Sequence, residues 1–186
     1  MDFENAFFAE DNEIDKIIRD HWIIMDEYCV NNDDSIDVDG NVKFSADYLT
    51  ELPLRFNKVT GDFDCSKLSL VTLKNAPLEV GGDFDCSFNN LISLEYAPTK
   101  VGGTITFDNM LKTICTGNVN CYFNEVKLLY RTDISNIRLP DLICENVTAL
   151  KVVFKYQKYF DIQNEYGFLN EEAFSILIKG IEEGLE

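Results

Sequence analysis

The 186-residue sequence contains few of the residues that build catalytic and metal-binding sites. It has one histidine, His21, and its six cysteines include no C-x-x-C pair, so the usual spacing of a Cys/His zinc site is missing. It also lacks the G-x-x-x-x-G-K-[ST], G-x-S-x-G and G-x-G-x-x-G motifs of phosphate-binding loops and nucleophile elbows. We therefore expect a protein that is not an enzyme and has no cofactor and no metal site.

Basic residues are scarce, because sixteen lysines and arginines stand against thirty-three aspartates and glutamates, for a formal net charge of -17. A protein this acidic is not expected to bind nucleic-acid phosphates directly. Residues 1–39 hold thirteen acids and two bases (net -11), whereas residues 40–130 hold ten acids and eight bases (net -2). The N-terminal segment is therefore a candidate charged surface of its own.

Long apolar runs are also missing. None approaches the roughly 20 residues of a membrane-spanning helix, and the N-terminal stretch MDFENAFFAEDNE is acidic, unlike a secretory signal. These features predict a cytoplasmic protein without membrane contact. In a reducing compartment the six cysteines are expected to be free thiols, buried as small apolar side chains without a disulfide.

What the sequence does contain is a repeat. Gly40, Gly61, Gly82 and Gly103 follow one another at intervals of 21 residues, and the hexapeptide GDFDCS starts at the second and again at the third. The clearest hydrophobic copy is F-x-C-x-x-N-x-L-x-x-L over residues 84–94. An interval of this length predicts a stack of repeats that bury one shared core.

Other copies of the hydrophobic pattern start at Val42, Phe63 and Val119. The copy at Ile105 is one residue short, and because Gly117 follows the preceding repeat glycine after only 14 residues, we interpret it as lacking its return segment. A looser copy over residues 142–149 either continues the stack or caps it. The strand-entry glycines are expected to allow a tight turn into each strand.

Over residues 38–150 the sequence resembles a small leucine-rich-repeat protein, because F-x-C-x-x-N-x-L matches the L-x-L-x-x-N-x-L core of that family. The A-P-x-x-V-G segments at 76–81 and 97–102 are similar to those of short repeat proteins encoded by bacteria and their large phages. The resemblance implies a protein-binding scaffold, such as a phage-encoded inhibitor or adaptor that acts on a host protein in the host cytoplasm. The fold alone does not identify the partner.

Alternation along a strand predicts that Phe63 and Cys65 face the core while the neighbouring aspartates face outward, and the next repeat does the same. Like charges on adjacent strands cost stability, and a basic partner surface offsets that cost. The alternative is a solvated surface that arose when the repeat copied itself. A glycosidase pair is not expected, because it needs a desolvated acid and a sugar cleft. The predicted partner-binding residues are Asp62, Asp64, Asp83, Asp85, Thr104 and Thr106, followed in their columns by Asn118 and Asn120.

Two other polar patterns have structural interpretations. Asn89 and Asn124 are expected to satisfy backbone groups where the chain leaves a strand, whereas Leu68 cannot do so. The stretch SIDVDGNVKF partly matches a calcium-binding EF-hand loop, but its first and twelfth positions are Ser35 and Ala46 instead of Asp and Glu. The start of a repeat explains its glycine better than calcium binding does.

Both ends of the chain are predicted to be helical caps that cover the open core. Asn170 is expected to be the N-cap of the C-terminal helix, and His21 is interpreted as a packed or capping residue. Residues 147–159 alternate enough to predict a strand. The residues at helical spacing are Ile14, Ile17, Ile18 and Met25 near the N-terminus, and Phe174, Leu177, Ile178, Ile181 and Leu185 near the C-terminus.

These expectations give an α/β fold, a short leucine-rich-repeat solenoid with a parallel sheet on one face and helical caps at both ends. The chain is predicted to be one domain over residues 1–186, with caps at 1–37 and 151–186 and repeats at 38–150. The expected function is protein–protein interaction with a basic partner surface. The alternative is an acidic nucleic-acid mimic that blocks a DNA-binding protein through residues 1–39, and its affinity would fall steeply with salt.

Overall fold

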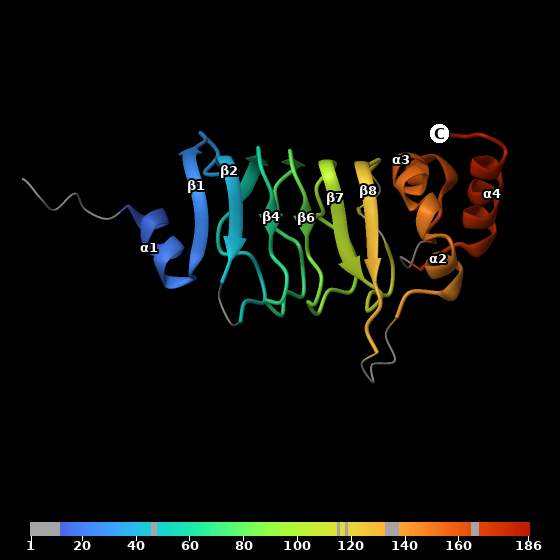
Figure 1. The fold of residues 1–186 in the computed structure, drawn as a ribbon, viewed down its shortest axis with the longest axis horizontal. Coiled ribbons are helices and arrows are strands. Elements are labelled where there is room, and N and C mark those ends of the chain that lie inside the picture. The colour runs from blue at the N-terminus through green and yellow to red at the C-terminus, as the bar shows by residue number, and fades with distance from the viewer. Residues whose placement is uncertain (1–11, 46–47, 115, 118, 133–137, 165–167) are drawn as a thin grey trace, which may run out of the picture.

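The computed structural model describes residues 12–45, 48–114, 116–117, 119–132, 138–164 and 168–186. The labelled strands lie side by side in one row, with α1 at its N-terminal end and the other helices at its C-terminal end (Figure 1). The described part of the chain contains no helix that is long and apolar enough to cross a membrane. The elements in chain order are α1 (Glu13–Asp20), β1 (Ile23–Val30), β2 (Ile36–Phe44), β3 (Phe56–Val59), β4 (Phe63–Asp64), β5 (Glu79–Val80), β6 (Phe84–Asp85), β7 (Lys100–Asp108), β8 (Tyr122–Leu129), α2 (Asp141–Glu145), the 3-10 helix η1 (Val147–Ala149), α3 (Leu150–Phe160) and α4 (Glu171–Glu182).

Two parallel ladders of strand pairs join consecutive repeats, which we call rungs. The first ladder pairs valines across β2, β3, β5 and β7 and ends on Phe123 of β8. Of the described strands, β1 alone is antiparallel to its neighbour. A parallel sheet in a solenoid with helices at both ends, as predicted, is therefore confirmed. The second ladder joins residues that stand 21 apart in the chain, namely Val42, Phe63, Phe84, Ile105 and Val126.

A glycine lies between the two ladders in each central rung. The amides of Gly61, Gly82 and Gly103 each donate to the carbonyl of the repeat glycine one rung earlier, at 2.7, 2.9 and 2.9 Å. None of these three glycines has a left-handed φ, so backbone freedom does not explain them. A Cβ on Gly82 would overlap the carboxylate of Asp62 and the backbone of Gly61. Glycine is needed here because the rungs approach each other closely.

The core confirms the predicted alternation along the strands. Phe63 and Phe84 are buried, and their rings stack with centroids 5.6 Å apart and 13° between the ring planes. Cys65 and Cys86, two residues further along, are buried as well. Each buried aromatic side chain contributes about 1.5–3 kcal/mol relative to an exposed one, so repetition supplies the core that no single rung could bury.

Asn89 confirms the predicted role of an asparagine where the chain leaves a strand. It is 4% exposed, and its Oδ1 accepts hydrogen bonds from the amides of Leu68 and Leu70, both at 3.0 Å. Its Nδ2 donates to the carbonyls of Cys65 and Cys86 at 2.8 and 2.9 Å. Because Leu68 stands in the equivalent position one rung earlier, this one asparagine satisfies the backbone of both rungs.

The last rung starts later than the sequence pattern predicts. Val126 pairs with Ile105, so Val126 and not Val119 opens this rung, and the 21-residue spacing continues. The return segment predicted to be lost is present, because the start of β8 pairs with the start of β7. Val119 is 41% exposed, so its match to the pattern is a coincidence of residue types. Asn124 lies exposed on β8, and the backbone role predicted for it is wrong.

The N-terminal cap is part helix and part strand. The side chain of Asn12 caps α1 by accepting a hydrogen bond from the amide two residues later at 2.8 Å, and His21 is the C-cap, as expected. Met25 was predicted to share the helical stripe, but it lies in β1. Trp22 follows the C-cap with a φ of 49°, and the isoleucine pair after it favours a strand.

The strand predicted for residues 147–159 is wrong, because this segment forms η1 and α3. Its apolar residues also fit a helical period. Phe154 packs edge-on against Phe123 of β8, with ring centroids 4.9 Å apart, so α3 covers the last rung. Residues 142–149 are not a rung, because α2 and η1 occupy most of them, and of the two interpretations the cap is correct. The buried residues of α3 are Leu150, Val153, Phe154 and Gln157.

The C-terminal helix α4 confirms its prediction. The Oδ1 of Asn170 accepts a hydrogen bond from the amide of Ala173 at 3.2 Å, which caps the first turn. Phe174 and Leu177 are buried. The apolar stripe of α4 therefore packs toward the core, as helical spacing indicates.

Candidate functional site

The predicted binding residues lie on the outer face of the sheet, the face turned away from the core. They form two columns that cross the rungs, with Asp62, Asp83 and Thr104 in one and Asp64, Asp85 and Thr106 in the other. Thr106 is only 9% exposed and adds little accessible surface. We call Asp62, Asp64, Asp83 and Asp85 the acidic columns. Beyond the threonines the columns continue onto Glu125 and Lys127 of β8, so the prediction of Asn120 is wrong, while Asn118 lies outside the described residues.

In the first acidic column, each side-chain oxygen accepts a hydrogen bond from a backbone amide of the following rung. We call this series of hydrogen bonds the relay. The Oδ1 of Asn41 accepts a hydrogen bond from the amide of Asp62 at 2.9 Å, and the Oδ1 of Asp62 accepts one from the amide of Asp83 at 2.8 Å. Asp83 accepts a hydrogen bond from the amide of Thr104 at 2.7 Å, and Asp26 of β1 accepts one from the amide of Asn41, also at 2.7 Å. Each side chain thus satisfies a backbone amide beside the glycine bend of the next rung.

The second acidic column ends the strands with Asx turns, in which an aspartate side chain binds the backbone two residues later. The Oδ1 of Asp64 accepts from the amide and the hydroxyl of Ser66 at 3.1 and 2.7 Å, and Asp85 accepts from the amide of Ser87 at 2.9 Å. Partial burial raises the pKa of Asp64, but hydrogen bonds from Ser66 and the Lys43 ammonium at 3.2 Å outweigh it. The net effect lowers the pKa of Asp64, which therefore carries a full negative charge at neutral pH.

Charge along the first ladder follows a different pattern on the same outer face. Its outward residues pair in register and alternate in sign. The acidic columns instead place aspartate next to aspartate on two neighbouring rungs. Lys43 offsets the charge of Asp64, but no cation alternates with the aspartates between these two rungs, so negative charge is concentrated at the centre of the face. The alternating residues are Asp37, Lys58, Glu79 and Lys100.

The relay does not need this negative charge. Asn41 occupies the same column as Asp62 and Asp83 and makes the same hydrogen bond with a neutral amide oxygen. The side chains of Asp62 and Asp83 are exposed to solvent. The negative charges of Asp62 and Asp83 are therefore not needed for this hydrogen bond.

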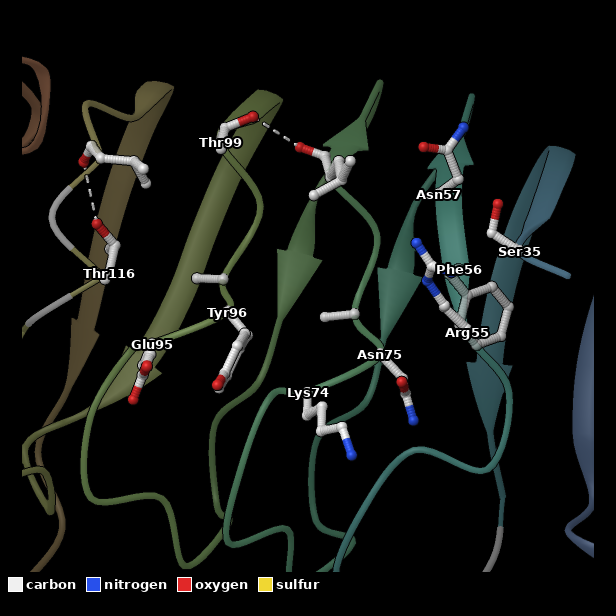
Figure 2. Close-up of a pocket in the computed structure, with 15 residues that line it drawn as sticks. Ser35, Arg55, Phe56, Asn57, Lys74, Asn75, Glu95, Tyr96, Thr99 and Thr116 are labelled. Carbon is white, nitrogen blue, oxygen red and sulfur yellow. Dashed lines mark hydrogen bonds between the residues drawn. The ribbon is translucent and has the colours of Figure 1, made fainter. Parts of the chain in front are cut away.

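A second surface, which the sequence analysis did not predict, is a groove with a volume of about 540 Å³ that crosses four rungs (Figure 2). It lies where each return segment enters the first ladder. Its floor includes Phe56, Ala76 and Ala97, all buried. Leu78, Tyr96 and Val119 also line it and are 57%, 54% and 41% exposed, so apolar surface is open to solvent here.

Three charged side chains also line the groove, namely Arg55, Lys74 and Glu95. Arg55 pairs with Asp33 at 3.0 Å and Lys74 with Glu51 at 3.3 Å, and all four side chains are at least 44% exposed. Exposed ion pairs of this kind contribute only about 0–1 kcal/mol. Both cations therefore remain available to a ligand.

Other candidate chemistry finds no site in the described residues. Asp37 and Asp39, which suggested an EF-hand, lie in β2, where Asp37 accepts a hydrogen bond from the side-chain Nδ2 of Asn57 at 2.7 Å and Asp39 accepts one from the hydroxyl of Thr60 at 2.9 Å. Within the described ranges, no group of three or more His, Cys, Asp or Glu could hold a metal ion.

Five of the six cysteines are described, and all five are free thiols. Burial raises the pKa of Cys65 and Cys86 well above the ordinary value, so neither forms a thiolate at neutral pH. Cys115 lies outside the described residues.

Comparisons of the chain with protein families, with curated proteins and with solved structures found no match.

Proposed function

We propose that the protein is a protein-interaction module that binds a basic surface of its partner through the acidic columns. One observation carries the proposal, which is that Asn41 makes the relay hydrogen bond without a charge. Asp62 and Asp83 therefore keep a charge that the relay does not use. An exposed charge without a structural task is suited to recognition of an opposite charge.

The energetics of the acidic columns support this assignment. Like charges directly opposite on neighbouring strands destabilise a sheet by a few tenths of a kcal/mol or more. A lysine or arginine from a partner relieves that repulsion only when the complex forms. Repulsion in the free protein thus adds to the preference for the bound state, and it selects against acidic partners.

A leucine-rich-repeat assignment belongs to the same proposal. The 21-residue rungs and the buried Asn89, which binds the backbone of two rungs, support it. Such a scaffold presents a sheet to another protein, and an adaptor or inhibitor role needs no catalytic group. The proposed module acts by occupying a partner surface.

The test compares two variants that remove equal charge. Asp62→Asn/Asp83→Asn keeps both Oδ1 acceptors, while Glu145→Gln/Glu182→Gln removes two exposed acids of α2 and α4. Immobilised wild-type protein and both variants are incubated with cell lysate, and the captured proteins are quantified by mass spectrometry. We expect one captured protein to be reduced roughly tenfold on the first variant only, as for a central charged contact.

Two outcomes contradict the proposal. An unchanged set of captured proteins on Asp62→Asn/Asp83→Asn excludes the acidic columns as the binding surface. Capture of DNA-binding proteins that is lost steeply between low and high salt, and equally on both variants, favours a nucleic-acid mimic.

A further inference from the structure

Tyr96 has a backbone conformation that does not suit its side chain. Its φ is 68°, in the left-handed region, where a bulky aromatic residue is an outlier. The residues 21 positions before and after it, Asn75 and Gly117, have φ values of 73° and 83°. Asparagine and glycine are the types that tolerate this conformation best. The backbone therefore does not explain the tyrosine.

Contacts within the protein do not explain it either. Phe88 also has a positive φ, 57°, but its ring lies 5.8 Å from the Lys67 ammonium and 5.7 Å from the Arg131 guanidinium. Tyr96 is 54% exposed. Within the described part of the chain its ring has no cation or aromatic partner, and its hydroxyl has no hydrogen-bond partner. Residues in unfavourable conformations cluster at binding sites, where the strain is offset by function.

The groove places Tyr96 beside the small residues of its floor. Tyr96 precedes Ala97 along the chain and Thr99 follows it, and Figure 2 shows the side chain of Thr99 near the top of the view and that of Tyr96 below it. Four rungs spaced about 4.8 Å apart span roughly 14 Å, the length of about four residues of extended chain. The groove therefore accommodates a peptide segment, whose side chains can contact Tyr96 and Leu78.

Charges along the groove indicate the chemistry of that segment. Arg55 and Lys74 lie on the first two rungs that form the groove, and Glu95 lies on the third. An acidic residue is complementary to the first two and a basic residue to the third. In the view of Figure 2 the side chain of Tyr96 lies between those of Lys74 and Glu95.

We propose that this groove binds an extended segment of a partner protein, about four residues long, in which an apolar residue separates an acidic residue from a basic one. The site is distinct from the acidic columns and does not rest on their function. Tyr96 is the anchor, because tyrosine combines a large apolar area with a polar end and is enriched among residues that dominate binding energy.

A yeast-displayed library of random 12-residue peptides tests this proposal. The library is selected on wild-type protein, and the enriched peptides are titrated against wild type, Tyr96→Asn and Lys74→Gln. Tyr96→Asn places the residue of position 75 on the same backbone, so the fold is expected to be at least as stable. We expect enriched peptides with the acidic–apolar–basic pattern, about tenfold weaker affinity with Tyr96→Asn, and a smaller loss with Lys74→Gln.

Three results overturn the proposal. The first is a selection without enrichment, and the second is enriched peptides that bind Tyr96→Asn as well as wild type. The third is self-association of wild-type protein in gel filtration that Tyr96→Asn abolishes, because the groove then binds a second copy. Asp62→Asn/Asp83→Asn should bind the enriched peptides as wild type does. The experiment therefore tests the groove independently of the proposed binding by the acidic columns.

Discussion

The two ladders of the sheet are both parallel and join the same rungs, yet they arrange charge in opposite ways. In the first ladder, equivalent residues change sign from rung to rung, as Lys58 and Glu79 do. In the second ladder, the same two rungs keep aspartate at both outward positions. A repeat that merely copied itself would retain charge equally in both ladders. The comparison therefore favours a task for the acidic columns beyond solvation.

The largest effect is expected from the core that both ladders share. Phe84→Ala should reduce the free energy of unfolding by roughly 3–5 kcal/mol, because it leaves a cavity beside the stacked ring of Phe63. Val80→Ala, in the first ladder, should cost less because fewer buried atoms are removed. Urea unfolding of both variants measures this, and a loss below about 1 kcal/mol for Phe84→Ala would contradict the register.

Gly82→Ala tests the bend that separates the ladders. The added Cβ overlaps the Asp62 carboxylate and the backbone of Gly61, so we expect a loss of about 1–3 kcal/mol, as for other overpacked sites. Gly180→Ala in α4 is the matched control, because its Cβ would approach only Leu185 at 3.8 Å. The control should gain about 0.5–1 kcal/mol from helix propensity. Equal effects on the two melting temperatures would refute the packing argument.

Glu79→Lys makes the first ladder resemble the second by placing three lysines in a row. We expect a loss of about 0.2–1 kcal/mol at low salt, because like charges then face each other across neighbouring strands. The loss should shrink in high salt, where exposed charges are screened. Glu79→Gln is the neutral control and should fall between wild type and Glu79→Lys. Thermal melts at two salt concentrations decide the matter, and a loss independent of salt would exclude repulsion as its cause.

The smallest effect concerns pH. Because the pKa of Asp64 is lowered in the fold, its carboxylate adds stability above the ordinary pKa of about 3.9, and that stability is lost as pH falls through the folded value. Asp64→Asn keeps an Oδ1 acceptor for Ser66 but removes the charge. Wild type should therefore exceed Asp64→Asn in stability at pH 7 and lose that advantage as the pH falls below the ordinary pKa of an aspartate, about 3.9. Urea unfolding across this pH range measures the difference in free energy of unfolding, which should shrink as the pH falls.

Much of the repeat architecture followed from the sequence because its signals are periodic. The glycine interval, the inward position of Phe84 and the backbone role of Asn89 each reflect one local geometry that recurs every 21 residues. The last rung was misplaced because matching residue types at Val119 outweighed the interval itself. Counting 21 residues on from Ile105 leads directly to Val126, where the strand lies.

The helix at residues 150–160 and the groove were missed for different reasons. Val, Phe and Tyr favour strands in isolation, but packing against Phe123 of the last rung selects the helical period of α3. The groove is formed by residues of several rungs, so no continuous segment of the sequence predicts it. The signal that could have revealed it is a comparison down the columns, where Tyr96 stands between Asn75 and Gly117.

The relay of side-chain acceptors has a direction. In every step the acceptor precedes the donor in the chain, from Asp26 to Asn41, then to Asp62, Asp83 and Thr104. During synthesis, each new rung therefore leaves the ribosome after the side chain that its amide needs. The amides of the relay therefore do not depend on a later rung, whereas the amides of Leu68 and Leu70 gain their acceptor only when Asn89 of the following rung is in place.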